Sequence, residues 1–222
     1  MIWVVVVCEG RTERDFVMQI LGPELTDSNV FVEARLIPTS PKGKGGALSG
    51  QRVLRFLRDT LRQRPDTYVT TFFDLYRLPT DFPGVGASSS DPLERAAAIE
   101  EELHKEVRLL AQRRPDRFLP YIQPHEFEAL LFSDTSHFAR EQPEWEQPAE
   151  ELAAARRGAA SPEHINDGED THPSARLKQL PGYRKVRHGP ALAERIGLDC
   201  MRRECAHFGN WLTRLESLPV LR

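Results

Sequence analysis

The sequence predicts an α/β protein, a three-layer sandwich with a mostly parallel sheet and a helical C-terminal extension. Residues 2–8 are apolar without exception and mostly β-branched, which is typical of a strand covered by helices on both faces. Further strand patterns at 30–37, 67–73 and 118–122 alternate with amphipathic helix patterns. This alternation of buried strands and helices indicates a parallel sheet with helices packed on it.

Size and composition are those of one globular chain. Its 222 residues suffice for an α/β core, expected at 1–133, and a mainly helical, loop-rich extension, expected at 134–222 and packed on the core. No apolar run approaches the roughly 20 residues of a membrane helix, so we expect no membrane association. An odd count of three cysteines, one of them in the first strand, argues against a disulfide framework. We therefore expect a cytoplasmic protein.

Helices are expected between and after the strands. Apolar residues recur at helical spacing in the second predicted helix, and five arginines between positions 52 and 64 occupy its other faces, a pattern that usually forms a solvated surface. Pro23 is expected to mark the end of the first helix, and Asp91 with Pro92 to open the longest one. The predicted helices are 12–22, 50–63, 91–113, 123–132 and 173–179, with a short helix inside 134–170 and two helices from residue 189 onward.

The first strand ends in an acidic turn. Glu9 and Gly10 follow the apolar run directly, and Glu13 lies at the start of the next helix. In an open α/β sheet, ligands bind in the crevice at the carboxyl ends of the strands, which is where Glu9 lies. One glycine and two glutamates cannot cradle a bare phosphate as a glycine-rich loop does, and they suit a divalent cation instead.

A second strand also ends in a carboxylate, Asp74. Parallel neighbours would bring Glu9 and Asp74 to one edge of the sheet, where we expect them to share Mg²⁺ or Mn²⁺. Glu126 is the expected third ligand because it follows the next strand. Glu13 and Asp81, the latter in a turn-rich loop expected to cover the site, are further candidate ligands.

Glu126 and Glu128 compete for the same role. On a helix, residues two apart point about 200° from each other, so only one of the two can face a given ion. Acidic side chains in a first helical turn also complement the helix dipole, which is an equally good explanation of Glu128.

Positive charge is concentrated in two stretches, although the chain as a whole carries a net charge of −3. A polyanion would therefore need a local basic patch. The glycine-rich loop after the second strand is either a solvated connection or a phosphate-binding loop. The segment from 176 to 188 is either the phosphate-facing side of the cleft, on a loop shaped by prolines and glycines, or a solvated counterpart of the acidic 141–170 stretch. Candidate phosphate-binding residues are Lys42, Lys44, Arg176, Lys178, Lys185, Arg187 and His188.

Glutamate-glycine after a first strand and aspartate after a later one resemble the Toprim fold of topoisomerases, primases and nucleases of overcoming-lysogenization-defect (OLD) type. In Toprim proteins the first-strand glutamate and an Asp-x-Asp pair hold magnesium. The chain matches these residues at Glu9 and Asp74 but carries Tyr76 in place of the second aspartate. The resemblance thus implies a Toprim-like sandwich, with a second metal only if Asp81 or a glutamate at 126 or 128 substitutes.

Five motifs span most of the chain: EGRTE at 9–13, the aspartate- and proline-containing segment 74–84, HEFEALLFSD at 125–134, the segment 165–177, and GYRKVRHGPALAERIGL at 182–198. In these motifs the chain resembles the bacterial family catalogued as domain of unknown function 4276 (DUF4276), which is grouped with Toprim-like proteins. Genes of this family often lie beside an ATPase of the ABC and SMC class in phage-defence or toxin pairs, so the resemblance implies such a partner.

Three functions follow from these patterns. The first is a Mg²⁺-dependent nuclease for DNA or RNA, in which Glu9 and Asp74 bind the ion and Lys185, Arg187 or Arg176 steadies charge on the phosphate. The second is a non-catalytic subunit that binds the ATPase or nucleic acid. The third, a phosphoryl-transfer enzyme of HAD or receiver type, is disfavoured because HAD sites begin with a nucleophilic aspartate. The oligomeric state, monomer or homodimer, stays open.

Overall fold

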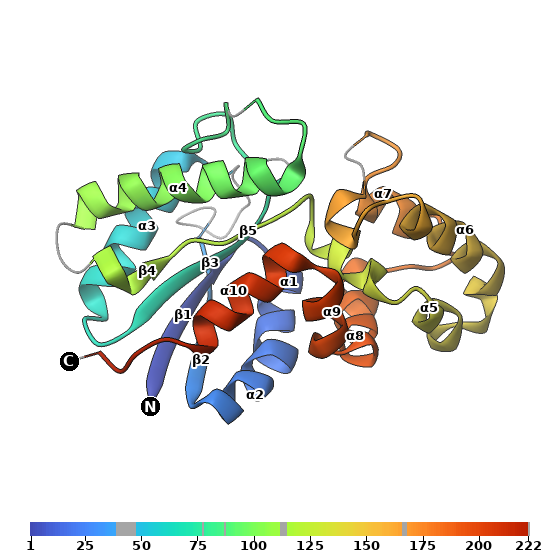
Figure 1. Ribbon diagram of the computed structural model, residues 1–222, viewed down its shortest axis with the longest axis horizontal. Coiled ribbons are helices and arrows are strands. Elements are labelled where there is room, and N and C mark those ends of the chain that lie inside the picture. The colour runs from blue at the N-terminus through green and yellow to red at the C-terminus, as the bar shows by residue number, and fades with distance from the viewer. Residues whose placement is uncertain (39–47, 77, 87, 112–114, 166–167, 222) are drawn as a thin grey trace.

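The structure is a computed structural model that describes residues 1–38, 48–76, 78–86, 88–111, 115–165 and 168–221. Its sheet is parallel throughout the described residues, in the order β2-β1-β3-β4, with β5 also paired to β3 (Figure 1). The predicted α/β class with a parallel sheet is therefore confirmed. The strands are β1 (Ile2–Cys8), β2 (Val30–Leu36), β3 (Tyr68–Asp74), β4 (Phe118–Leu119) and β5 (Ile122–Gln123).

The predicted strand at 118–122 consists of two short pieces. Pro120 lies between β4 and β5, and proline has no N–H group to continue the ladder of hydrogen bonds. Instead, Thr71 accepts a hydrogen bond from the Tyr121 backbone N–H through its hydroxyl, at 2.8 Å.

Side chains of the central strands alternate between two buried cores. Val4, Val6 and Cys8 contribute to one core, and Val5 and Val7 contribute to the other. The second core is closed by α3 (Gly50–Gln63) and α4 (Pro92–Ala111), and α1 (Arg11–Phe16), α2 (Gly22–Leu25) and α10 (Ala206–Glu216) cover the first (Figure 1). The fold is thus the expected three-layer sandwich.

The first helical stretch is longer and less regular than predicted. A π-helical turn, Val17–Leu21, joins α1 to α2, and a 3₁₀ turn, Thr26–Ser28, completes the stretch. The prediction that Pro23 ends the helix was wrong. Pro23 lies in the first turn of α2, directly after the π-helical turn, where the regular α-helical hydrogen-bond ladder is already interrupted.

The predicted helix at 123–132 was also wrong. After β5 the chain bends at Pro124 and His125, where His125 has a φ of 60°. Glu126 is extended, and only a 3₁₀ helix follows, Phe127–Ser133. The helices beyond it are α5 (Ser136–Glu141), α6 (Glu146–Arg157), α7 (Pro173–Leu177), α8 (Lys185–Ile196) and α9 (Leu198–Glu204), with 3₁₀ turns at Pro115–Arg117, Pro143–Trp145 and Pro162–His164.

The tail from residue 185 forms three helices where two were predicted. Gly197, with a φ of 78°, separates α8 from α9, and Cys205 separates α9 from α10. The prediction that Lys185 and Arg187 lie on a loop was wrong, because α8 begins at Lys185 and continues through Pro190.

The core on the α1 side unites both parts of the chain. Phe72 of β3 stacks on Trp211 of α10 with ring centroids 5.6 Å apart, and Leu192 of α8 is buried in the same core. The boundary expected at residue 133 thus runs through a shared core and stays a prediction.

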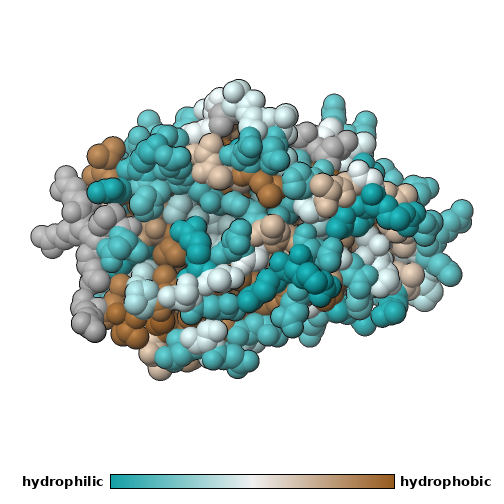
Figure 2. Space-filling model, in the orientation of Figure 1, coloured by the Kyte–Doolittle hydropathy of each residue, from teal (hydrophilic) through white to brown (hydrophobic). Residues whose placement is uncertain are grey.

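Within the described ranges, no helix has the length and apolar character needed to cross a membrane. Apolar surface gathers near the two termini (Figure 2), where Met1, Trp3 and Val220 are exposed.

Candidate active site

The carboxyl edge of the sheet brings Glu9 and Asp74 onto neighbouring strands. Cys8 of β1 pairs with Phe72 of β3, so Glu9 follows this pair by one residue and Asp74 by two. Since alternate side chains of a strand share a face, Asp74 lies on the same face as Phe72. This is the face on which α1 and α8 pack, and it determines which side chains can reach Asp74.

Lys185, the first residue of α8, joins three carboxylates at this edge. Its Nζ lies 3.0 Å from Glu128 Oε2, 3.3 Å from Glu13 Oε1 and 3.9 Å from Asp74 Oδ2. The three acidic side chains come from β3, α1 and the 3₁₀ helix, and they are almost fully buried, whereas Lys185 keeps more than a third of its side chain exposed. We call Glu13, Asp74, Glu128 and Lys185 the lysine-carboxylate cluster.

The backbone fixes the position of this cluster. Asp74 Oδ1 accepts a hydrogen bond from Phe127 N–H at 2.8 Å, so the start of the 3₁₀ helix is tied to the end of β3. Gly10 leaves the space that Glu13 fills, since a Cβ at residue 10 would lie 2.6 Å from Glu13 Oε2. Glu128 Oε1 is buried and has no hydrogen-bond partner among the described residues.

Negative charge exceeds positive charge at this edge. Burial, followed by the charge of Glu13, raises the pKa of Asp74 well above its ordinary value, and burial also raises the pKa of Glu128. Glu9 lies at the exposed rim, where loss of hydration around its carboxyl and the nearby Glu13 raise its pKa to about 7. Burial opposes the charge of Lys185, but the surrounding carboxylates outweigh it and raise the pKa of the ammonium.

Two of the expected metal ligands are engaged elsewhere. Glu126 accepts hydrogen bonds from both the backbone N–H and the hydroxyl of Ser174, each at 2.9 Å. Asp81 Oδ1 accepts a hydrogen bond from Gly50 N–H at 2.9 Å, at the start of α3. Glu126 therefore binds the first turn of α7, and Asp81 binds the first residue of α3.

Glu128 was weighed against Glu126 in the sequence, and Glu126 was chosen as the expected ligand. Its position two residues after Glu126 suggested opposite sides of an α-helix, and the sequence favoured Glu126. Because Glu126 is extended and only Glu128 lies in the 3₁₀ helix, the helical geometry does not apply between them. The sequence did contain a clue to Glu128: it is the only charged residue in the apolar run 127–132, and a buried charge needs a partner.

The candidate phosphate-binding residues do not form one patch. Lys185 and Arg187 are two apart on α8, so they point in nearly opposite directions, and Arg187 is exposed. His188 is buried and its Nδ1 accepts a hydrogen bond from Arg184 N–H at 2.9 Å. Arg176 donates a hydrogen bond to Thr171 O at 2.7 Å, and Lys178 is exposed at the end of α7. Lys42 and Lys44 lie outside the described residues.

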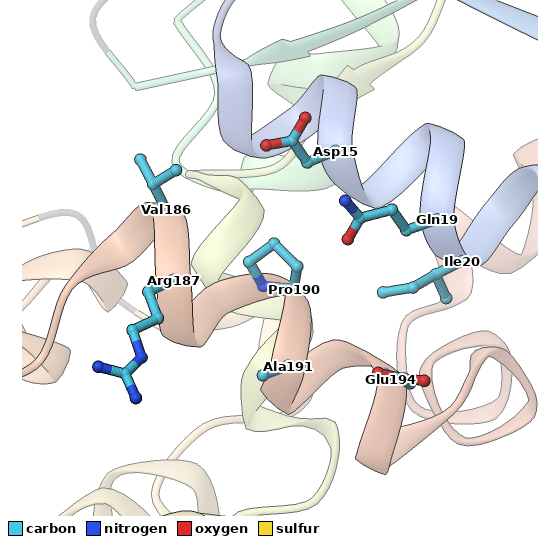
Figure 3. A pocket seen from close by; sticks show the side chains of 8 residues that line it. All are labelled: Asp15, Gln19, Ile20, Val186, Arg187, Pro190, Ala191 and Glu194. Atoms are coloured by element: carbon cyan, nitrogen blue, oxygen red, sulfur yellow. The ribbon is translucent and has the colours of Figure 1, made fainter.

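A groove of about 340 Å³ lies beside the cluster, between the α1 stretch and α8 (Figure 3). Asp15 and Gln19 line it from one side and Pro190 from the other, while the Arg187 side chain extends away from α1. Asp15 is paired with Arg14 at 2.7 Å. The groove therefore offers mixed polar and apolar walls rather than a concentrated positive charge.

Three comparisons relate this chain to known proteins. The sequence matches the family described as "Domain of unknown function (DUF4276)" over residues 8–216. The chain belongs to the DUF4276 family. The comparison with curated proteins found no match. Among solved structures, this DUF4276 chain is similar to the C-terminal region of the OLD protein of Xanthomonas campestris pv. campestris, with a TM-score of 0.41, 16% sequence identity, and coverage of 96% of this chain and 94% of that one.

The donor set of the DUF4276 chain fits a hard divalent cation by its chemistry. Glu9, Glu13 and Asp74 offer carboxylate oxygens, which Mg²⁺ prefers, and one ammonium does not balance four carboxyl groups. As the side chains lie here, no group of three acidic, histidine or cysteine residues in the described part of the chain is arranged to hold an ion. Lys185 serves as the counter-ion of the cluster in this arrangement.

Tyr76 lies two residues after Asp74, where the sequence resemblance led us to expect a second aspartate. Its ring stacks on His172 with centroids 4.6 Å apart, and its backbone N–H donates to His125 O at 2.8 Å. The residue thus contributes packing at the rim of the site and no carboxylate.

Proposed function

We propose that this DUF4276 chain is a divalent-metal-dependent phosphodiesterase that cleaves DNA or RNA. The supporting observation is the convergence of Glu13, Asp74 and Glu128 on Lys185, beside Glu9, at the carboxyl edge of a parallel sheet. Ligands of open α/β sheets bind at this edge. Metal-dependent hydrolysis of a phosphodiester needs a binding site for a cation next to a binding site for the anionic phosphate. Carboxylates can supply the first and a neighbouring lysine the second.

The residues divide into two roles. Glu9, Glu13 and Asp74 would hold Mg²⁺ or Mn²⁺, and the bound ion would supply Lewis-acid polarisation and a water of lowered pKa. Asp74 is oriented for this by the Phe127 N–H that holds its Oδ1. Glu128 holds Lys185 at the edge of the sheet, and the Lys185 ammonium would then stabilise negative charge on the phosphate.

A cleavage assay tests the proposal. Purified protein is incubated with plasmid, single-stranded DNA and transfer RNA in Mg²⁺, Mn²⁺ or chelator, alone and with a candidate ABC/SMC-type ATPase partner. Asp74→Asn should reduce cleavage by about 100-fold or more, because it removes a charged ligand at the reacting centre. Asp66→Asn is the matched control, since Asp66 is exposed just before the opposite end of β3.

Metal-independent cleavage, or equal activity of the Asp74→Asn variant, would contradict the proposal. A cleaving contaminant is excluded by the same comparison, because both variants are purified in the same way.

A second function is favoured by the ion pairs of Lys185. A lysine bonded to three carboxylates is also the arrangement of a purely structural cluster, and Tyr76 supplies no second aspartate. The chain would then be a non-catalytic subunit that binds an ABC/SMC-type ATPase or nucleic acid in a two-component defence system. This alternative predicts a stable complex with the ATPase and no cleavage in any arm of the assay.

A further inference from the structure

Helix α3 presents a row of arginines to solvent. At 100° per residue, Arg55, Arg58 and Arg62 fall within a sector of about 60°. Val53, Leu57 and Leu61, which are buried in the core between α3 and the sheet, lie on the opposite side of the helix. We call Arg55, Arg58 and Arg62 the arginine face of α3.

This face carries more positive charge than its neighbours neutralise. Arg58 pairs with Asp59, the next residue in the chain, at 2.7 Å. Arg55 and Arg62 are exposed, and neither forms an ion pair or hydrogen bond with another described residue. At the end of the helix Arg64 and Arg35 share a single carboxylate, Glu33, at 2.9 and 2.7 Å.

Helix α3 begins toward the carboxyl edge of the sheet and packs on the face opposite to the lysine-carboxylate cluster. The Gly50 N–H at the start of α3 is bound by Asp81 from the loop that follows β3, and α3 itself leads from β2 to the start of β3. The start of α3 therefore lies toward the carboxyl edge of the sheet, where Asp74 is. The seven helical steps from Arg55 to Arg62 cover about 10 Å, comparable to about three base-pair steps along the axis of a duplex.

We propose that the arginine face of α3 binds the phosphate backbone of nucleic acid and leads it toward the carboxyl edge of the sheet, on whose other face the lysine-carboxylate cluster lies. The reason for binding nucleic acid rests on the proposed function, whereas the binding surface itself is inferred from the charge and spacing of the arginines. A row of exposed guanidinium groups suits phosphate oxygens, which arginine binds in bidentate fashion. The exposed sector carries no apolar stripe that a partner helix could bury, so a polyanion fits it better than a folded protein surface does.

Binding is measured on the full chain in chelator, where no metal-dependent cleavage interferes. The probe is a fluorescently labelled single-stranded DNA of about 20 nucleotides, followed by anisotropy between about 50 and 200 mM NaCl. The test variant is Arg55→Gln/Arg58→Gln/Arg62→Gln. The matched control is Arg108→Gln/Arg157→Gln/Arg214→Gln, which removes the same charge from exposed positions on α4, α6 and α10.

The test variant should bind about tenfold or more weakly at the lowest salt, and its slope of log K against log salt should fall by about 2, while the control stays within about twofold of the parent. Thermal unfolding checks that both variants fold. Equal affinity and slope in test and control variants would overturn the inference, as would a parent that does not bind the probe.

The same experiment separates this inference from the proposed function. If only the test variant loses binding but the parent cleaves nothing with any metal, the arginine face stands and the nuclease proposal fails. If the parent cleaves but the test variant binds like the control, the nuclease stands and the arginine face does not take part. Displacement of the DNA by polyglutamate at equal charge concentration would indicate an acidic protein partner and overturn the nucleic-acid assignment.

Discussion

Lys185 Nζ lies 3.0 Å from Glu128 Oε2, and this ion pair joins the first residue of α8 to the 3₁₀ helix after β5 across 57 positions of sequence. The glutamate is fully buried and the lysine partly exposed. One end of the pair is therefore fixed by packing, while the other can exchange partners with solvent or a ligand. This asymmetry is what an ammonium needs if it is to serve both as a counter-ion and as a phosphate contact.

Replacing Lys185 with methionine should destabilise the fold by about 1–3 kcal/mol at pH 8, because three crowded carboxylates lose their counter-charge. We place the loss below that of a fully buried pair because the ammonium is partly solvated. The loss should be smaller at pH 5, where protonated carboxyls need no counter-ion. Urea unfolding at both pH values measures it.

A double variant provides the control. Adding Glu128→Gln to Lys185→Met removes one of the repelling charges and should recover part of the lost stability. If Lys185→Met unfolds at the same urea concentration as the parent at pH 8, the cluster is not coupled to folding in the way proposed here.

The sheet could be predicted from the sequence because its signals are local. The run Ile2–Cys8 is apolar on both faces, and only a strand between two helical layers can bury such a run. The errors came where one residue alters the backbone. Pro120 divides the last strand, and His125, with its positive φ, bends the chain where a helix was predicted.

The site could be predicted only in part. Glu9 and Asp74 follow directly from the strand ends, since the parallel register determines where both lie. The role of Glu128 could not be read in advance, because its partner Lys185 is placed by the packing of α8 on α1 and on the 3₁₀ helix. Gly189 makes that packing close, since a Cβ there would lie 3.3 Å from Phe127 and 3.4 Å from Thr12.

Asp81→Ala separates a structural carboxylate from a metal ligand. The change removes the hydrogen bond to Gly50 N–H at the start of α3 and should cost about 0.5–2 kcal/mol of stability, as the loss of a helix cap does. It should leave the metal concentration for half-maximal cleavage unchanged. A large shift in that concentration, at conserved stability, would return Asp81 to the ligand set.

Gly10→Ala tests whether Glu13 is a metal ligand. The backbone at Gly10 is extended, with a φ of −130°, so alanine fits it without strain. Its Cβ would meet Glu13 Oε2, the flexible end of a side chain, and should displace that carboxylate. We expect weaker binding of Mg²⁺, measured by calorimetry, and a loss of stability of about 1 kcal/mol or less, because Glu13 also gives up its contact with the partly solvated Lys185. Unchanged Mg²⁺ affinity would remove Glu13 from the proposed ligands.

The last prediction concerns a pH-dependent contact away from the site. His207 Nε2 lies 2.7 Å from Glu100 Oε1, Glu163 binds the His207 backbone N–H, and Tyr121 stacks on the imidazole ring. Burial disfavours the imidazolium, but the hydrogen bond and charge of Glu100, with the charge of Glu163, raise the pKa of His207. The link joins α10 to α4, and Glu100 also accepts a hydrogen bond from Ile122 N–H of β5.

A histidine whose pKa is raised by folding stabilises the protein fully below its unfolded pKa of about 6.5, and this contribution disappears as the pH rises through the folded pKa. The parent should therefore lose stability from about pH 6.5 upward. His207→Gln and Glu100→Gln should each remove that part of the loss, because neither variant retains the titrating pair. Thermal unfolding in steps from pH 5 to about pH 9 measures the difference between each variant and the parent. Parallel curves for parent and variants would show that the His207–Glu100 pair does not titrate with folding.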